Sequence, residues 1–199
     1  TLAALAQELG QGEAALRALI NQQLGFRNFN DGIALTGKLT NTGNITVDIG
    51  ANGWASGRGI YINGDVAGTL TNSGSITVNV VENSNGSVYA YGVYVNGVGV
   101  SGTLTNSGTI SATASANNSS HATAYGIYSD SDVSGALTNS GAITAIASVS
   151  GSNSSPSARA YGIYVNGVIG TLTNSGTIRA TANYNANATS SSGHAYAYG

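Results

Sequence analysis

Acidic side chains are the first place to look for chemistry in this chain. Enzymes that cleave polysaccharides on repetitive β folds need clustered carboxylates, or a base beside a cation. Beyond residue 30 the acids are Asp31, Asp48, Asp65, Glu82, Asp130 and Asp132. They mostly stand at different distances from the recurring sequence LTNSG, so we do not expect them to converge. Asp130 and Asp132 form a lone Asp-x-Asp, which is more typical of a turn than of a calcium site. We therefore predict that the chain is not an enzyme.

Metal, cofactor and nucleic-acid sites are not predicted either. The chain has no cysteine, and His121 and His194 lack partners at ligand spacing, so we expect both in exposed loops. No glycine-rich phosphate loop with its lysine occurs. Only six Lys and Arg are present and the net charge is −2, so the basic surface that nucleic acid requires is missing.

Five asparagines recur at nearly constant spacing and are candidates for a structural ladder. The sequence LTNSG occurs four times and LTNTG once, beginning at Leu39, Leu70, Leu104, Leu137 and Leu172, so the spacings are 31, 34, 33 and 35 residues. Their asparagines are Asn41, Asn72, Asn106, Asn139 and Asn174. If the copies stack, each amide can hydrogen-bond to the next, as in cross-β packing. A glycan contact is the functional alternative. Because Asn and Gly tolerate left-handed backbone angles, Asn-Ser-Gly also predicts a tight corner.

Tyrosines recur in a second motif, which reads YGVYVNG at Tyr91, YGIYSDS at Tyr125 and YGIYVNG at Tyr161, with a degenerate copy, RGIYING, at Arg58. Stacking would give one column of Tyr91, Tyr125, Tyr161 and Tyr198, and a second of Tyr61, Tyr94, Tyr128 and Tyr164. Strict alternation places the columns on opposite faces, although a bulge at the intervening Gly would change that. We expect one column at the core edge. The second is a candidate stripe for binding a sugar or protein partner.

Threonines flank the leucine of most copies and form a third candidate surface. The pairs are Thr69 and Thr71, Thr103 and Thr105, and Thr171 and Thr173, with Lys38 and Thr40 in the first copy and Ala136 and Thr138 in the fourth. A flat two-column threonine array would suit ice binding, which we keep as a minor alternative. Lys38 and Ala136 interrupt the array, and threonine is also simply a good strand residue.

The elements that must position these residues are short strands. From Ile33 onward apolar and polar residues alternate, and Leu is followed by Ile six residues later in every copy. A period of about 33 residues marks a repeat array whose units bury apolar faces only by stacking. We predict an all-β, right-handed parallel β-helix of about five coils over residues 30–199, with three strands in each coil. Two smaller coils per repeat remain an alternative. The segment between each Ile and the next Tyr-Gly grows along the chain, so later strands should be longer.

Residues 1–29 differ from the repeats. Leu2, Leu5, Leu9, Leu16 and Leu19 are among apolar residues at helical spacing. We predict a short α-helical cap that covers the first coil, because repeat proteins require capped ends. A subunit contact or a secretion-related segment is the alternative. No apolar run approaches the roughly 20 residues of a membrane helix, so no membrane span is predicted.

The run GIYVNGVIGTLTNSGTI, with its near-copies, resembles repeats in the passenger regions of bacterial autotransporters and related surface adhesins. The resemblance covers about residues 33–199 and implies a β-helix displayed outside the outer membrane. Only 7% of residues are charged, which suits a stacked β structure because like charges on successive coils would repel.

Three functions follow as expectations. The first is a non-enzymatic extracellular rod that serves adhesion, biofilm or cell contact through surface glycans or proteins. The second is a filament or surface-layer subunit that stacks head to tail with copies of itself through open coil ends. The third, a minor one, is an ice-binding or glycan-binding solenoid.

Overall fold

The computed structural model describes residues 27–29, 35–84, 86–97, 99–117, 121–151, 156–167, 169–186 and 194–199. Within these ranges the protein is an all-β parallel solenoid of about four turns without a helix. The helical cap predicted for residues 1–29 lies outside the described residues, apart from Arg27–Phe29. These three residues form strand β1, which pairs with β4.

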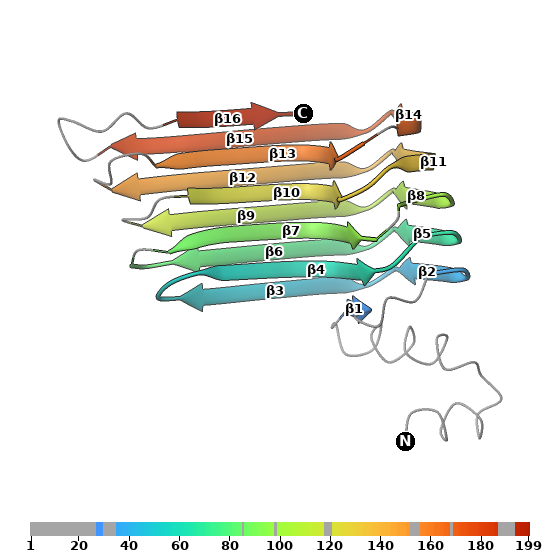
Figure 1. Cartoon of the computed structure of the whole chain (residues 1–199), viewed down its shortest axis with the longest axis horizontal. Helices are drawn as coiled ribbons and strands as arrows, with labels where there is room; N and C mark the ends of the chain where they lie inside the picture. The colour runs from blue at the N-terminus through green and yellow to red at the C-terminus, as the bar shows by residue number, and fades with distance from the viewer. Residues whose placement is uncertain are drawn as a thin grey trace, which may run out of the picture.

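Three parallel sheets form the sides of the solenoid, and the chain visits them in turn (Figure 1). Sheet 1 contains β1 (Arg27–Phe29), β4 (Ala55–Asn63), β7 (Ser87–Asn96), β10 (His121–Ser129), β13 (Ser157–Val165) and β16 (His194–Tyr198). Sheet 2 contains β2 (Lys38–Asn41), β5 (Thr69–Asn72), β8 (Thr103–Asn106), β11 (Val133–Asn139) and β14 (Ile169–Asn174). Sheet 3 contains β3 (Asn44–Ala51), β6 (Ser75–Glu82), β9 (Thr109–Asn117), β12 (Ala142–Gly151) and β15 (Thr177–Ala186).

Each sequence repeat makes one turn, as the one-coil interpretation predicts. Identical positions of successive repeats pair directly, so Leu70 pairs with Leu104 and Ile76 with Ile110. The strands of sheet 3 lengthen along the chain, from 8 residues in β3 and β6 to 9 in β9 and 10 in β12 and β15. The strands of sheet 3 therefore follow the length of the variable segment, as expected, whereas β4, β7, β10 and β13 of sheet 1 stay at 9 or 10 residues.

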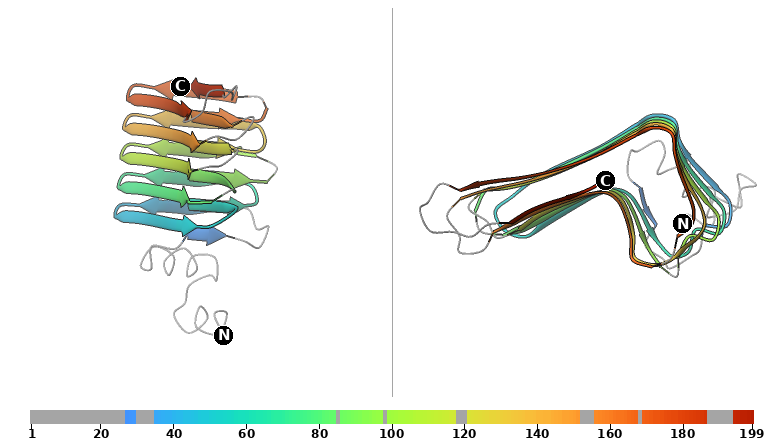
Figure 2. Two further views of the ribbon diagram at one scale, coloured as in Figure 1. Left: turned by 90° about the vertical axis from the view of Figure 1, so that its left-hand side faces the viewer. Right: turned by 90° about the horizontal axis from the view of Figure 1, so that it is seen from above.

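The hydrophobic core fills the inside of every turn. In β8 and β9, Leu104, Ile110, Ala112 and Ala114 are buried, whereas Thr105 beside them is only half-buried, so the predicted alternation is confirmed. Removing a large aliphatic side chain from water stabilises the fold by about 1.5–3 kcal/mol. Sheets 1 and 3 face each other along a long, narrow arm, and sheet 2 lies toward the opposite end of the cross-section (Figure 2). Small inward residues such as Ala112 and Ala114 allow that close approach.

The glycines of three Tyr-Gly pairs, Gly92, Gly126 and Gly162, are required by this approach. A Cβ on Gly126 would overlap the Ile143 side chain of sheet 3 and lie 2.5 Å from the carbonyl oxygen of Gly162. In the right panel of Figure 2, the path of sheet 1 bends close to the label C, which marks the C-terminal residue Gly199. In β7 both Gly92 and Val93 are buried, which shifts the alternation by one residue.

The corner glycines have a different role from the one predicted. We expected left-handed backbone angles at Asn-Ser-Gly, but positive φ occurs instead at Gly53, Gly64, Gly99 and Gly167. The corner Gly108 is needed because a Cβ there would overlap the carbonyl oxygen of Gly74 in the preceding turn. Close stacking of turns, and not backbone handedness, therefore selects glycine at this corner.

Candidate binding surfaces and the asparagine ladder

The asparagines of the repeat form an internal hydrogen-bonded ladder at the corner between sheets 2 and 3. Asn41 Nδ2 donates to Asn72 Oδ1 at 2.8 Å, and Asn72 Nδ2 donates to Asn106 Oδ1 at 2.7 Å. Asn106 Nδ2 in turn donates to Asn139 Oδ1 at 2.8 Å, and Asn139 Nδ2 to Asn174 Oδ1 at 2.7 Å. The same orientation repeats at each step, so each side-chain amide donates a hydrogen bond to the amide of the following turn.

Each ladder amide also holds the backbone of its corner. Asn106 Nδ2 lies 3.3 Å from the carbonyl oxygen of Gly108 and 3.4 Å from that of Ala142 in the next turn. Asn41, Asn72, Asn106 and Asn139 are at most 2% exposed. Side chains this deeply buried join successive turns and do not form a surface that a glycan could contact.

The two tyrosine columns lie on one face, the outer face of sheet 1. The shifted alternation at Gly92 leaves Tyr91 and Tyr94 both half-buried on that face, with ring centroids 4.8 Å apart. The expectation that one column lies at the core edge is therefore wrong, because neighbouring strands share a change of alternation at this glycine, where two successive residues face inward while the register is kept. We call the combined set the tyrosine array; it comprises Tyr61, Tyr91, Tyr94, Tyr125, Tyr128, Tyr161, Tyr164 and Tyr198.

Rings of the first column stack face to face from turn to turn. The centroid of Tyr125 lies 5.1 Å from that of Tyr91 and 4.9 Å from that of Tyr161, with planes within 10° of parallel. Tyr161 and Tyr198 continue the column at 5.0 Å. Because each ring face contacts the next ring, this column offers a partner mainly ring edges and hydroxyl groups.

The second column, which we predicted as a partner-binding stripe, is less regular. Tyr61 and Tyr94 are tilted at 5.1 Å, Tyr94 and Tyr128 meet edge to face at 4.9 Å, and Tyr128 and Tyr164 stack at 5.3 Å. Edge-to-face contacts such as Tyr125 with Tyr128, at 4.8 Å, join the columns. Such pairs each add about 0.5–1.5 kcal/mol beyond the area that they bury.

Burial favours the protonated phenol at three positions of the array, Tyr91, Tyr125 and Tyr128. Desolvation is the main cause that raises the pKa of Tyr91 to about 12, and the neighbouring Tyr94 adds to the effect. Desolvation also raises the pKa of Tyr125 and of Tyr128. At neutral pH these three tyrosines therefore present neutral hydroxyl groups, which can both donate and accept hydrogen bonds.

Charged groups lie at two places in the array, and the sequence interpretation missed both. Arg58 occupies the Tyr91 position in β4, and its guanidinium carbon lies 5.0 Å from the Tyr61 ring centroid and 5.3 Å from that of Tyr94. The degenerate RGIYING copy was the available signal. Asp130 Oδ1 accepts a hydrogen bond from the Tyr128 hydroxyl at 3.0 Å. The spacing of two residues in Tyr-Ser-Asp gave no sign of this bond.

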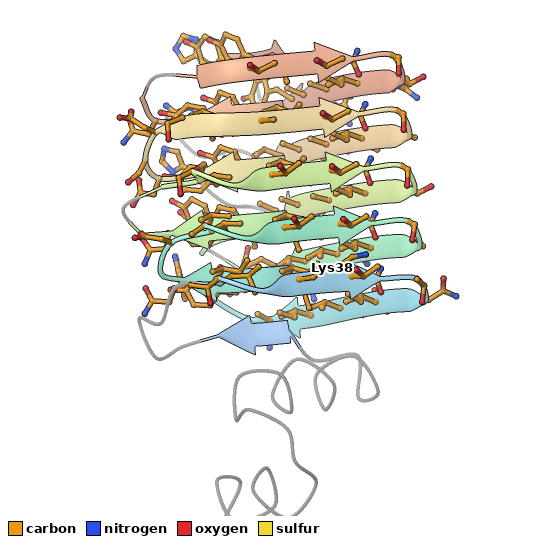
Figure 3. The ribbon with its side chains drawn as sticks, turned by 90° about the vertical axis from the view of Figure 1, so that its right-hand side faces the viewer. Lys38 is labelled. Carbon is orange, nitrogen blue, oxygen red and sulfur yellow. The ribbon has the colours of Figure 1, made fainter. Side chains whose placement is uncertain are left out.

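Threonines form the outer face of sheet 2, which Figure 3 views directly. Thr40, Thr71, Thr105, Thr138 and Thr173 share one register position. The other column contains Lys38, labelled in Figure 3, followed by Thr69, Thr103, Ala136 and Thr171. Lys38 and Ala136 therefore interrupt one of the two threonine columns on this face.

The acids are dispersed over the described residues. Asp48 is exposed on sheet 3, whereas Glu82, at the end of β6, is fully buried. Glu82 Oε1 accepts hydrogen bonds from the backbone N–H groups of Gly53, at 3.2 Å, and Ser84. Asp130 and Asp132 lie in the turn after β10, and Asp31 is outside the described residues. Over the ranges described above, no group of three or more His, Cys, Asp or Glu side chains could hold a metal ion.

The two histidines each begin a strand of sheet 1. His121 begins β10 and is half-buried, while His194 is exposed and stacks on Tyr196 at 5.8 Å. No helix in the part of the chain that the structure describes is long and apolar enough to cross a membrane.

Comparison of the chain with protein-family models, with curated proteins and with solved structures finds no match.

Proposed function

We propose that this chain is a non-enzymatic extracellular rod that makes contacts between cells or between a cell and a surface. One observation carries the proposal: outward threonines on sheet 2 and outward tyrosines on sheet 1 recur in register from turn to turn. Successive strands are about 4.8 Å apart, so a partner group that fits one turn meets the same group on the next. Many weak contacts of this kind add up to strong attachment through multivalency.

The resemblance of the repeats to passenger regions of bacterial autotransporters adds a location to this proposal. In that setting the rod stands outside the outer membrane and contacts glycans or proteins of a neighbouring cell. The low charge of the outer faces supports the proposal, because repulsion from negatively charged cell surfaces is weak when only 7% of residues carry charge.

An attachment assay tests this function. Beads coated with the folded chain are applied to bacterial layers, epithelial layers and a glycan array, and bound beads are counted after washing. Beads coated with a charge-matched globular protein of similar mass are the control. We expect the folded chain to attach to at least one of these surfaces well above the control. Attachment equal to the control on all of them contradicts the proposal.

Head-to-tail assembly is the second candidate, and the last described turn favours it. Leu172 pairs with the buried Leu137 but is itself 46% exposed, and Ile169 at 38% follows the same pattern. The outer edges of β14 and β15 thus accept a further turn, from more chain or from another copy. Electron microscopy of the 199-residue chain over a concentration series tests this idea. Filaments that lengthen with concentration support assembly, and single rods of constant length contradict it.

A further inference from the structure

Tyrosine and tryptophan are the side chains in this protein that an oxidant is most able to attack. The chain contains no Cys and no Met, the two residues that normally react first with oxidants, but it contains 11 Tyr and one Trp. Trp54 is 67% exposed and its ring lies 6.2 Å from that of Tyr89, which contacts Tyr91 at 6.4 Å. Ring contacts therefore run without a break from an exposed tryptophan into the tyrosine array.

Tyrosines of successive turns are held in the arrangement that coupling requires. Tyr128 pairs in register with Tyr164, and their rings lie 5.3 Å apart and within 5° of parallel. Tyr125 and Tyr161 form an equivalent pair at 4.9 Å. All four side chains are half-buried, so their neighbours restrain them while part of each side chain stays exposed to solvent.

One of these pairs has a proton acceptor. The Tyr128 hydroxyl donates to Asp130 Oδ1 at 3.0 Å. Asparagine stands at the same place in the turns before and after, as Asn96 and Asn166, so the carboxylate is specific to this turn. A phenol that loses an electron must also lose its proton, and a carboxylate already in hydrogen-bond contact can take it directly.

We propose that the tyrosine array is a site of oxidative cross-linking, at which a haem peroxidase with hydrogen peroxide joins Tyr128 to Tyr164 as dityrosine. Each phenol loses one electron to the oxidant and one proton, which at Tyr128 passes to Asp130. The two phenoxyl radicals form a carbon–carbon bond between their ortho carbons, and the ortho hydrogens move to the phenol oxygens to restore both rings. The protein loses two hydrogen atoms in total, and one hydrogen peroxide becomes two water molecules.

The cross-link has a structural consequence for a stacked rod. It joins residues that are 36 positions apart (164 − 128) but directly adjacent on neighbouring strands. A covalent bond across this loop restricts the unfolded chain, as a disulfide does, in a protein that has no cysteine. The oxidised rod should resist denaturant better than the untreated one.

Peroxidase treatment of the full chain tests the proposal. Dilute protein is incubated with horseradish peroxidase and hydrogen peroxide, digested, and mapped by mass spectrometry and dityrosine fluorescence. We expect a linked peptide pair containing Tyr128 and Tyr164, two hydrogens lighter than its parts, in a species that migrates as a monomer. Urea-unfolded chain treated in the same way should lack this pair, because nothing then holds the rings together.

Four variants separate the roles of the residues. Tyr128→Phe and Tyr164→Phe keep the ring but each should abolish the linked peptide. Tyr184→Phe, a matched change on sheet 3, should leave its yield unchanged. Asp130→Asn should lower the yield of the Tyr128–Tyr164 link while that of Tyr125–Tyr161 is retained. Absence of intramolecular dityrosine, equal yield in folded and unfolded chain, or equal loss of both links in Asp130→Asn overturns the proposal.

Discussion

Removing one amide from the middle of the asparagine ladder should destabilise the protein more than removing the last one. Asn106→Ala deletes the donor to Asn139 Oδ1 at 2.8 Å and the acceptor for Asn72 Nδ2 at 2.7 Å. An acceptor left buried without a donor costs about 1–3 kcal/mol. Asn72 Nδ2 keeps its bond to the Thr109 carbonyl oxygen at 3.2 Å, so its loss is about 0.5–1.5 kcal/mol. The expected total is a decrease of about 1.5–4.5 kcal/mol in the free energy of unfolding.

Asn174→Ala is the matched control because it removes the same side chain from an exposed end of the ladder. Asn139 Nδ2 then loses one acceptor but keeps the carbonyl oxygens of Gly141 and Thr177, each at 3.4 Å. Its expected cost is about 0.5–1.5 kcal/mol, that of one hydrogen bond.

Urea unfolding, followed in parallel by circular dichroism and tyrosine fluorescence, measures both changes. The ladder account predicts a clearly lower midpoint for Asn106→Ala than for Asn174→Ala. Equal midpoints in the two variants would refute the reasoning, since the amides would then act as independent surface groups.

Three further predictions follow from the same contacts. Asn106→Asp places a carboxylate in a buried amide position, and burial raises the pKa of that carboxyl group. The variant should therefore gain stability as the pH falls and the carboxylate is protonated. Urea midpoints measured between pH 4 and pH 8 test this. Gly126→Ala should cost about 1–3 kcal/mol by overpacking against Ile143, whereas Gly50→Ala, with open space at its Cβ, should change the midpoint little. Burial raises the pKa of Tyr91 to about 12. Stability should therefore be complete below the unfolded tyrosine pKa of about 10 and be lost as the pH rises toward 12, in an alkaline titration that records phenolate absorbance and circular dichroism together.

The sequence was sufficient to predict the architecture because its repeat is regular. The constant step from Leu104 to Ile110 and its copies requires two strands with inward apolar residues, and the fixed period places equal residues on adjacent strands. These relations are local or follow from the period alone. No long-range geometry was needed to derive them.

The position of the tyrosines could not be predicted in the same way. Both columns share a face because Gly92 lies against Ile110 of the opposite sheet, a contact between positions 18 residues apart (110 − 92). The distance between sheets 1 and 3 determines whether a Cβ fits there, and strand alternation carries no information about that distance. The same limit explains the corner glycines, whose role depends on the spacing between turns.

In-register stacking of the repeats is the central claim, because the asparagine ladder and the tyrosine array both depend on it. Spin labels attached after Thr40→Cys and Thr173→Cys substitutions measure it directly, since the chain has no other cysteine. These positions share one column and are separated by four strand steps, from β2 to β14. At about 4.8 Å per step, double electron–electron resonance should give a narrow distribution centred near about 19 Å. A broad distribution centred at a much longer distance would contradict the account.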